Sequence, residues 1–260
     1  MKQILNIENL SIGYPSKKKD IVIATDINLS INKPKLICLL GENGIGKSTL
    51  LRSISKVQSV LKGEIKIDDK DLLSYNSAEL SKKISIVLTE KIPPNNLTVY
   101  ELIALGRQVY TNWIGTLNEE DKSAIDNAIN LAKINTIKHS KVDELSDGQY
   151  QKVMIARALA QDTSIILLDE PTAHLDINNK VAIFHLLKNL ANAPHNGKLI
   201  IISSHELQLA IQTADDLWLM SKNKFISGEK NELIKNNELQ KMLNTNLVSF
   251  DNKTKQFLFH

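Results

Sequence analysis

The feature that most constrains this chain is the segment GENGIGKST at residues 41–49. It directly follows a continuous apolar run, Lys35–Leu40, and leads into a segment of helical character, Ser48–Ser55. A glycine-rich stretch that ends in Lys-Ser between a strand and a helix is the pattern of a phosphate-binding loop. A glycine-rich turn with a chance lysine is the alternative, and the flanking strand and helix weigh against it. The segment therefore predicts an α/β fold that binds a nucleoside triphosphate.

Each residue type in this loop has its own task. Glycines allow successive backbone N–H groups to point inward and enclose phosphate oxygens. Lys47 brings a positive charge to the β- and γ-phosphates, the Ser48 hydroxyl is placed to bind Mg²⁺, and the helix N-terminus adds favourable charge. We therefore expect the nucleotide to contact the whole loop, which consists of Gly41, Glu42, Asn43, Gly44, Ile45, Gly46, Lys47, Ser48 and Thr49.

Helices and short apolar strands alternate in the second half of the chain. Short apolar strands between helices are typical of a parallel sheet that is covered on both faces. The expected order is a helix, a strand, a helix, a strand and a helix, at Gln149–Ala160, Ser164–Leu168, Asn178–Asn192, Lys198–Ser203 and Glu206–Thr213.

The first third of the chain has the character of short β segments, and the middle has that of helices. Between residues 93 and 139, apolar residues recur at the three-to-four spacing of a helix, as in Val99–Leu105 and Glu119–Ala132. The last residues, Leu247–His260, resemble a hairpin that turns at Asp251–Lys253. The expected early strands are Ile4–Ile12, Val22–Ile31, Lys35–Leu40, Gly63–Ile67 and Ile84–Leu88.

A second informative segment, IILLDEP at residues 165–171, is a buried strand that ends in two carboxylates. At the carboxyl end of a parallel strand, such acids lie at the crevice where ligands bind. Because adjacent strand residues face opposite ways, the two acids are expected to differ in role. Asp169 is expected to face Mg²⁺, and Glu170 to orient and help deprotonate the attacking water. Two surface acids at a strand end are the alternative.

A third motif, LSDGQ at residues 145–149, is followed by KVMIARAL at residues 152–159 and then by the acidic strand. In this order the three motifs resemble those of the ATP-binding cassette (ABC) family of ATPases, over roughly residues 1–225. The resemblance implies an α/β fold: a P-loop NTPase (RecA-like) core with an N-terminal antiparallel β subdomain and an inserted helical signature subdomain. The implied ABC ATPase domain spans residues 1–225, with the helical subdomain at about 91–160. Residues 226–260 are then a short C-terminal extension with the hairpin.

The resemblance also implies that the chain works as a homodimer. The family signature is LSGGQ, so Asp147 replaces its first glycine, while Ser146, Gly148 and Gln149 match. Ser146 and the N-terminus of the next helix form a second anion site, which cannot reach its own phosphate loop if the helical subdomain separates them. In the family each signature closes on the ATP of the partner. Since Asp147 adds negative charge there, we expect its side chain to point away from the γ-phosphate.

Three further positions match functional residues of the family. Asp176, after Leu175, matches the loop that crosses to the dimer partner. His205 matches the switch histidine that contacts the γ-phosphate, so Glu170, His205 and Lys47 are the expected catalytic residues; a surface histidine at a helix start is the alternative. Tyr14 matches the aromatic residue that stacks on adenine, although an aromatic after a first strand is commonly a core residue.

One departure concerns the metal. The family places a glutamine after the strand that corresponds to Ile84–Leu88, where it contacts Mg²⁺ and relays motion to the membrane partner. This chain has no glutamine in VLTEK, residues 87–91. Spacing favours Thr89 at that position and chemistry favours Glu90, because both offer oxygen to the metal. The expected metal ligands are therefore Ser48, Asp169, and Thr89 or Glu90.

The segment LTVYELIALGR at residues 97–107 is similar to the corresponding segment in importers of ferric siderophores, haem and cobalamin. This resemblance implies a complex of two ATPase subunits, two transmembrane permease subunits and an external binding protein, powered by ATP with Mg²⁺. Two alternatives remain: a soluble ABC ATPase in assembly or regulation, such as iron–sulfur assembly, and an exporter subunit. A chromosome- or repair-type ATPase is disfavoured. Such proteins carry a very long coiled-coil insertion between the phosphate loop and the signature, whereas here only residues 50–144 lie between them and they show no heptads.

Composition sets the expected location. The net charge of +3 is too small to argue for a nucleic-acid surface. One cysteine, Cys38, excludes an internal disulfide and fits a reducing compartment. The first residues lack the apolar stretch of a signal peptide, and no segment approaches the ~20 apolar residues that span a bilayer. Because the resemblance to importer ATPases implies permease partners, we expect a peripheral protein at the cytoplasmic face of the inner (plasma) membrane.

Overall fold

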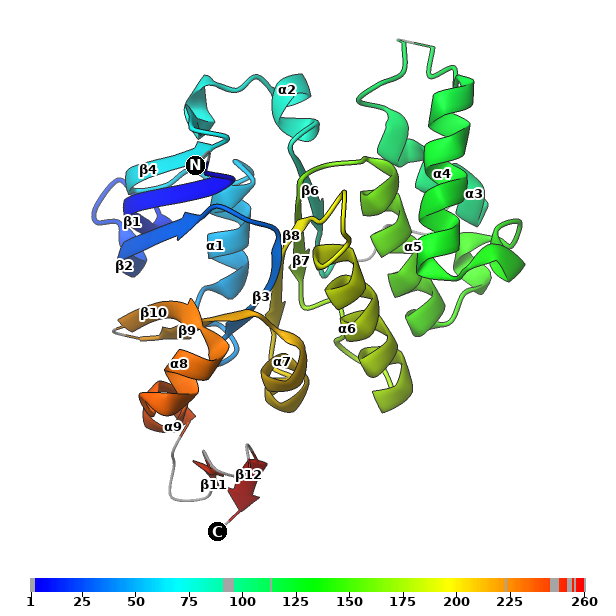
Figure 1. Cartoon of the computed structure of the whole chain (residues 1–260). Coiled ribbons are helices and arrows are strands. Elements are labelled where there is room, and N and C mark those ends of the chain that lie inside the picture. The colour runs from blue at the N-terminus through cyan, green and yellow to red at the C-terminus, as the bar shows by residue number, and fades with distance from the viewer. Residues whose placement is uncertain are drawn as a thin grey trace.

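The structure is a computed structural model that describes residues 3–90, 96–112, 114–222, 224–243, 248–251, 254 and 256–259. Its centre is a six-stranded sheet in the order β10-β9-β3-β8-β7-β6 (Figure 1). Every pair in it is parallel except β9 with β10, which is antiparallel. The strands are β3 (Lys35–Leu40), β6 (Ile84–Val87), β7 (Ile165–Asp169), β8 (Leu199–Ser204), β9 (Asp216–Ser221) and β10 (Lys224–Glu229).

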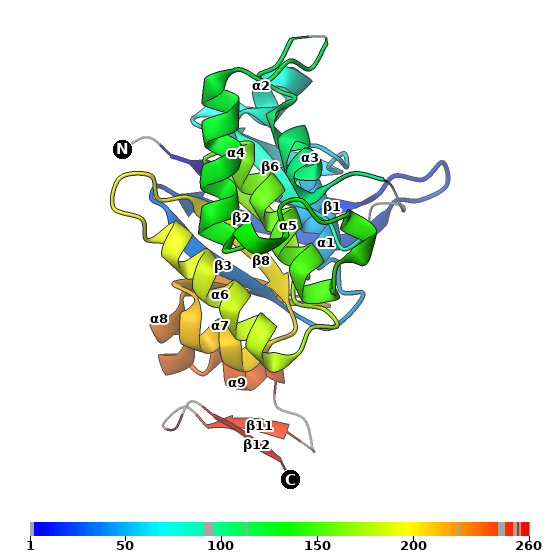
Figure 2. The same cartoon turned by 90° about the vertical axis from the view of Figure 1, so that its right-hand side faces the viewer.

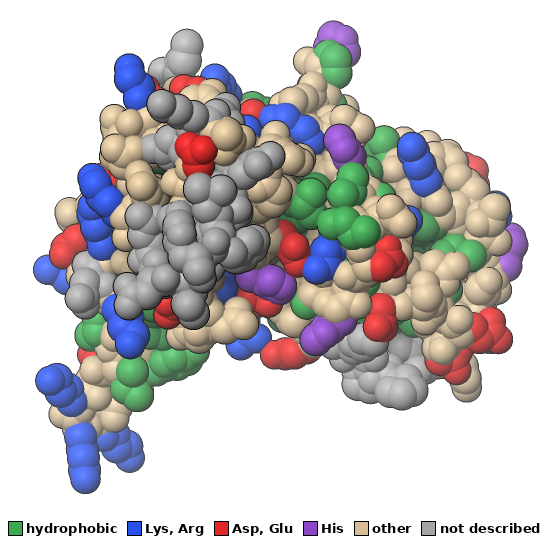
Figure 3. Space-filling model, turned by 90° about the horizontal axis from the view of Figure 1, so that it is seen from below, with side chains coloured by type: hydrophobic (Ala, Val, Ile, Leu, Met, Phe, Trp, Pro, Cys, Tyr) green, Lys and Arg blue, Asp and Glu red, His purple; other side chains and the backbone are tan. Residues whose placement is uncertain are grey.

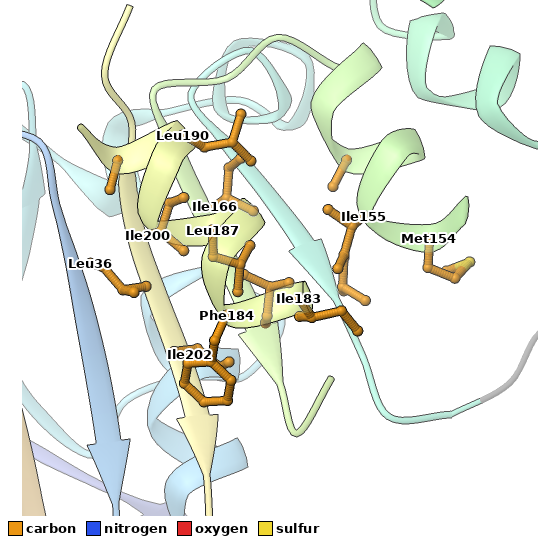
Figure 4. Close-up of a cluster of buried hydrophobic side chains, with 14 of the residues drawn as sticks. Leu36, Met154, Ile155, Ile166, Ile183, Phe184, Leu187, Leu190, Ile200 and Ile202 are labelled. Atoms are coloured by element: carbon orange, nitrogen blue, oxygen red, sulfur yellow. The ribbon is translucent and has the colours of Figure 1, made fainter. Parts of the chain in front are cut away.

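Both faces of this sheet are buried, which explains why its strands are continuous apolar runs. In β3, Leu36, Cys38 and Leu40 join one core cluster, whereas Ile37 and Leu39 join the other. The first cluster lies under the helices that Figure 1 shows on one side of the sheet, and Figure 4 shows part of it, where Phe184 packs beside Ile202. These helices are α5 (Asp147–Ala160), α6 (Ile177–Ala191) and α7 (Leu207–Thr213).

The second cluster joins the central sheet to α1 (Lys47–Ile54) and to an antiparallel sheet. That sheet has the order β2-β1-β4-β5, and its strands pair antiparallel throughout. The predicted N-terminal antiparallel β subdomain is therefore confirmed. Its strands are β1 (Leu5–Tyr14), β2 (Ile21–Ile31), β4 (Lys62–Ile67) and β5 (Lys70–Asp71).

The described residues between β6 and β7 are rich in helices, as predicted. The longest predicted helix there, Glu119–Ala132, is observed with the same bounds as α4. Asn118 caps the start of this helix, and its side chain accepts from the backbone N–H of Asp121 in a capping box. Figure 2 shows α4 beside α5 and α3. The same part contains α3 (Val99–Ala104), η2 (Leu105–Arg107), η3 (Asn135–Ile137) and η4 (Val142–Glu144), whereas η1 (Leu72–Ser74) and α2 (Ser77–Ser81) precede β6.

A buried ion pair fastens this helical part together. Arg107 donates from Nε to Asp121 Oδ1 at 2.9 Å and from Nη1 to the carbonyl oxygen of Ala160 at 2.8 Å. Both charged side chains are almost fully buried, and the guanidinium lies 3.9 Å from the centre of the Tyr110 ring. This is the partnered use of arginine that favours it over lysine in buried sites.

The C-terminal region differs most from the sequence prediction. The sequence indicated no element between Thr213 and Leu247, but β9, β10, α8 (Lys230–Lys235) and α9 (Glu238–Leu243) lie there. The pairing of β10 with β9 runs to Glu229, past the expected end of the ATPase domain at residue 225. The predicted hairpin is confirmed as β11 (Val248–Asp251) with β12 (Gln256–Phe259). Of its expected turn, residues 252 and 253 lie outside the described residues.

Charged side chains of both signs lie on the surface. Figure 3 shows basic, acidic and histidine side chains close to one another on the face seen from below. Among the described residues, no helix is both long enough and apolar enough to cross a membrane.

Candidate active site

The phosphate loop connects the end of β3 to the start of α1, as predicted. Gly46 directly precedes α1 with a φ of +112°, and a Cβ at this position would lie 2.2 Å from Ile23 Cγ2. Gly44 also has a positive φ, of +76°. Only glycine adopts this sequence of conformations without strain, and it turns backbone N–H groups toward a common centre. The first turn of α1 contains no acidic residue that would compete for an anion.

Lys47 is the buried cation of this loop. Its side chain is 4% exposed, and its Nζ donates to the carbonyl oxygens of Gly41 at 3.0 Å and Glu42 at 3.1 Å. The same Nζ lies 3.3 Å from Glu170 Oε1. A buried ammonium is costly unless it is paired, and phosphate oxygens are partners of the same kind as this carboxylate. Ser48 is half-buried beside Lys47, whereas Glu42, Asn43 and Gly44 are exposed at the tip of the loop.

Tyr14 ends β1 beside this loop. Its hydroxyl lies 3.3 Å from Thr49 Oγ1, so strand and loop are in contact. The side chain is 48% exposed. Tyr14 is therefore not a core aromatic, and its ring lies exposed beside the phosphate loop.

The two acids after β7 are separated by a change of backbone conformation. Asp169 is the last residue of β7 and is buried, whereas Glu170 lies outside the strand with a φ of +47°. Strand alternation, on which the sequence argument rested, is therefore not what turns Glu170 away from Asp169. A non-glycine residue in the left-handed region is strained, and such residues cluster at functional sites.

Ser203 holds this turn in place. Its Oγ donates to Asp169 Oδ1 at 2.7 Å and accepts from the backbone N–H of Glu170 at 2.9 Å. The sequence analysis did not single out Ser203. The signal was the pair of serines at the end of the strand before His205, since a polar residue inside an apolar strand needs a partner.

His205 follows β8 and reaches the same place. Its Nδ1 lies 3.7 Å from Glu170 Oε2, and its Nε2 lies 3.3 Å from Glu206 Oε1. The three expected catalytic residues are thus brought together, with Glu170 between Lys47 and His205. The Glu170 carboxylate can accept a proton. It lies between Lys47 and His205, two groups that can stabilise anionic oxygen.

Thr89 and Glu90 lie in different surroundings. Thr89 donates from Oγ1 to the carbonyl oxygen of Asp169 at 3.0 Å. Glu90 instead accepts from Arg52 Nη2 at 2.8 Å, and its side chain is 73% exposed. Of the two candidates, Thr89 is therefore the one beside the acidic strand end. Hydroxyl and carboxylate oxygens are the donor set that suits Mg²⁺.

The signature residues form the start of α5. Ser146 Oγ accepts from the backbone N–H of Gln149 at 3.3 Å, and Gln149 Oε1 accepts from the backbone N–H of Ser146 at 2.9 Å. This capping box begins the helix at Asp147 rather than at the predicted Gln149. In the described part of the chain, no hydrogen bond or ion pair joins Ser146 or Gln149 to the phosphate loop.

Gly148 and Asp176 connect the signature to the start of α6. A Cβ at Gly148 would lie 2.8 Å from Asn179 Cγ, so the glycine permits close approach of the two helices. Asp176 accepts from the backbone N–H of Asn179 at 3.0 Å and from its Nδ2 at 2.6 Å. The backbone hydrogen bond from Asn179, and then that from its side chain, lower the pKa of the Asp176 carboxyl.

Comparison with known proteins matches this arrangement of motifs. The family "ABC transporter" matches residues 24–173. An uncharacterized ABC transporter ATP-binding protein of Methanocaldococcus jannaschii is 36% identical over 247 residues, which cover 94% of this chain and 83% of that protein. The iron(3+)-hydroxamate import ATP-binding protein FhuC of Bacillus subtilis is 34% identical over 222 residues, which cover 85% of this chain and 80% of that protein.

A solved structure agrees with the fold. The dimeric structure of a bacterial ABC transporter cassette superposes with a TM-score of 0.74 at 26% identity, and the match covers 87% of this chain and 98% of that one. The family match over residues 24–173 contains the phosphate loop, the signature and the acidic strand. The chain therefore belongs to the ABC transporter family and is one of its ATP-binding cassettes, which bind and hydrolyse ATP.

Proposed function

We propose that this chain is the ATP-hydrolysing subunit of a transporter that imports an iron complex, of the siderophore or haem type, or cobalamin. The observation that carries the hydrolytic part is the convergence of Lys47, at the start of α1, with Glu170 after β7 and His205 after β8. The relative named for iron(3+)-hydroxamate import supports the transported class. The resemblance of residues 97–107 to the same class of importer supports it as well.

In this proposal the phosphate loop binds the triphosphate and Lys47 exchanges its contact with Glu170 for the β- and γ-phosphate oxygens. Glu170 then orients a water molecule, whose oxygen bonds to the γ-phosphorus while the bond to the ADP oxygen breaks. The proton of the water passes to Glu170 or to the released phosphate. His205 donates a hydrogen bond to the γ-phosphate oxygens, and Tyr14 stacks on the adenine.

Mg²⁺ fits the oxygen donors at the strand end. Ser48, Asp169 and Thr89 would hold it, and when bound it supplies positive charge that neutralises the β- and γ-phosphates. Glu90 is the weaker candidate, because it contacts Arg52.

The complete unit in this proposal is a homodimer of the ATPase with two transmembrane permease subunits, supplied by an external binding protein. Ser146, Gly148 and Gln149 of one subunit then face the ATP held by the other, and Asp176 lies at the crossing between them. The superposition on a dimeric cassette supports this assembly. The subunit would act peripherally, at the cytoplasmic face of the membrane that holds the permeases.

Glu170→Gln tests the hydrolytic role. The change keeps the shape of the side chain but removes the proton acceptor, so we expect ATP binding to persist while turnover falls by at least about a hundredfold. The trapped ATP-bound dimer should elute earlier in size exclusion. Glu229→Gln, an acid in β10, is the control and should hydrolyse ATP normally. Undiminished hydrolysis by Glu170→Gln would remove this residue from its role.

The transported class needs its own experiment. The full chain is purified from membranes of its host, its permease is identified, and the complex is reconstituted in liposomes with its binding protein. Ferrichrome, haemin and cyanocobalamin are the probes for stimulation of ATP hydrolysis. We expect one of the three to stimulate hydrolysis and to accumulate inside. Stimulation by none of them, in a complex that hydrolyses ATP, would contradict the proposed class.

A further inference from the structure

Glu206, the residue after His205, has an unusual place at the start of α7. It occupies the position that precedes the first turn, where a short polar side chain such as aspartate or serine commonly accepts from backbone N–H groups of its own helix. Its carboxylate makes no such hydrogen bond. It faces sideways instead, toward Lys180 of α6, with which it forms an ion pair, and toward His205 Nε2 at 3.3 Å. The Glu206 carboxylate therefore contacts Lys180 and His205 rather than the backbone of α7.

Hydrogen bonds fix the backbone conformation around Glu206 and thereby the direction of its side chain. The backbone N–H of Leu207 donates to the carbonyl oxygen of His205 at 3.0 Å, and Glu206 has φ −81° and ψ 72°. These values are those of an inverse γ-turn. The backbone N–H of Glu206 donates in addition to Ser204 Oγ at 2.9 Å. The turn fixes the direction of the Cα–Cβ bond of Glu206, and the buried Ser204 fixes the turn.

His205 needs such a support. Its side chain is 46% exposed, so packing alone does not fix the ring. An imidazole keeps one orientation when each ring nitrogen has a partner. Glu170 lies on the Nδ1 side at 3.7 Å and Glu206 on the Nε2 side at 3.3 Å, so the ring lies between two carboxylates. Glu170 is expected to move when ATP binds, because it shares Lys47 with the phosphates, whereas Glu206 is anchored by Lys180.

We propose that Glu206 is a positioning residue for His205, and that Lys180 holds the Glu206 carboxylate for this task. The inference rests on the proposed role of His205 at the γ-phosphate. The active site then extends to α6. Lys180 lies in the first turn of this helix, which Asp176 caps, and the backbone N–H of Lys180 donates to the carbonyl oxygen of Asp176 at 3.0 Å. The start of α6 and the histidine are thereby joined through two side chains.

The test is steady-state ATP hydrolysis by the purified full chain. Glu206→Ala and Lys180→Met should each lower kcat by roughly tenfold, since a misplaced catalytic group costs this much or more. The KM for ATP should change by less than about twofold, because neither side chain is expected to touch the nucleotide. Lys188→Met is the matched control: Lys188 lies in the same helix and is ion-paired with Asp215, but far along from the site. It should keep the wild-type kcat.

A charge-reversed pair separates positioning from simple packing of α6 on α7. Lys180→Glu with Glu206→Lys restores an ion pair between the helices but places an ammonium at His205 Nε2. We expect kcat to stay low in this double variant while the melting temperature recovers. Wild-type kcat in the double variant, or in Glu206→Ala, would overturn the inference. If instead the wild type itself fails to hydrolyse ATP, or Glu170→Gln hydrolyses it normally, the proposed function fails and not this inference alone.

Discussion

Replacement of Asp121 by asparagine should destabilise the protein strongly. Asp121 is 1% exposed and Arg107 is 4% exposed, so the substitution leaves a buried guanidinium without its carboxylate. Removal of one partner from a buried pair costs about 3–5 kcal/mol. Asparagine keeps one oxygen that can accept from Arg107 Nε, but its amide cannot accept from the backbone N–H of Asn118, as Asp121 Oδ2 does at 3.1 Å. We therefore expect about 3 kcal/mol.

The measurement is thermal unfolding of the full chain by circular dichroism. For a chain of this size, about 3 kcal/mol corresponds to a fall in Tm of roughly 6–12 °C. Glu119→Gln is the matched control in the same helix, because Glu119 pairs with Lys122 at 2.7 Å in an exposed i,i+3 pair. Solvent screens an exposed pair of this kind, so it contributes little to stability. A fall in Tm for Asp121→Asn no larger than for Glu119→Gln would refute the reasoning that burial makes the Arg107 pair indispensable.

Three further predictions concern the site and the core. Gly148→Ala should lower stability by about 1 kcal/mol, because its Cβ displaces the Asn179 side chain from its hydrogen bond to Asp176; Asn179→Ala should remove this clash, so a double-mutant cycle should show coupling, and additive losses would exclude the contact. Thr89→Ala should raise the Mg²⁺ concentration needed for half-maximal hydrolysis, whereas Glu90→Gln should not; the opposite pattern would assign the metal to Glu90. Burial raises the pKa of the Cys38 thiol far above its ordinary value of 9.0. Above pH 9 the folded chain keeps the Cys38 proton that the unfolded chain releases. The contribution of this thiol to the free energy of unfolding is therefore complete below pH 9, and it falls as the pH rises further, by about 1.4 kcal/mol per pH unit at most. Cys38→Ala should remove that part of the slope in urea titrations, and an unchanged slope would contradict it.

Much of the fold could be predicted because local signals agreed with the tertiary structure. Glu119–Ala132 is a helix with the predicted bounds, since its apolar spacing and its Asn118 cap both act within the segment. The observed start of α5 lies two residues before the predicted Gln149, because the capping box of Ser146 and Gln149 starts the helix at Asp147. The strands β9 and β10 were missed, although LWLM at residues 217–220 is a continuous apolar run that the pattern of the earlier strands would have identified.

The chemistry of this protein can be predicted from its motifs alone. The phosphate loop, the acidic strand and the signature are contiguous motifs, so their residue types, order and spacing can be recognised without coordinates. The sequence also indicated that Lys47, Glu170 and His205 follow elements of one sheet. Only the tertiary structure decided which atoms meet. Glu170 turns toward Lys47 and His205 because its φ is positive and Ser203 holds its backbone, and Thr89 contacts Asp169 while Glu90 pairs with Arg52. These contacts join residues that are far apart in the chain, and long-range contacts depend on packing that local patterns do not specify.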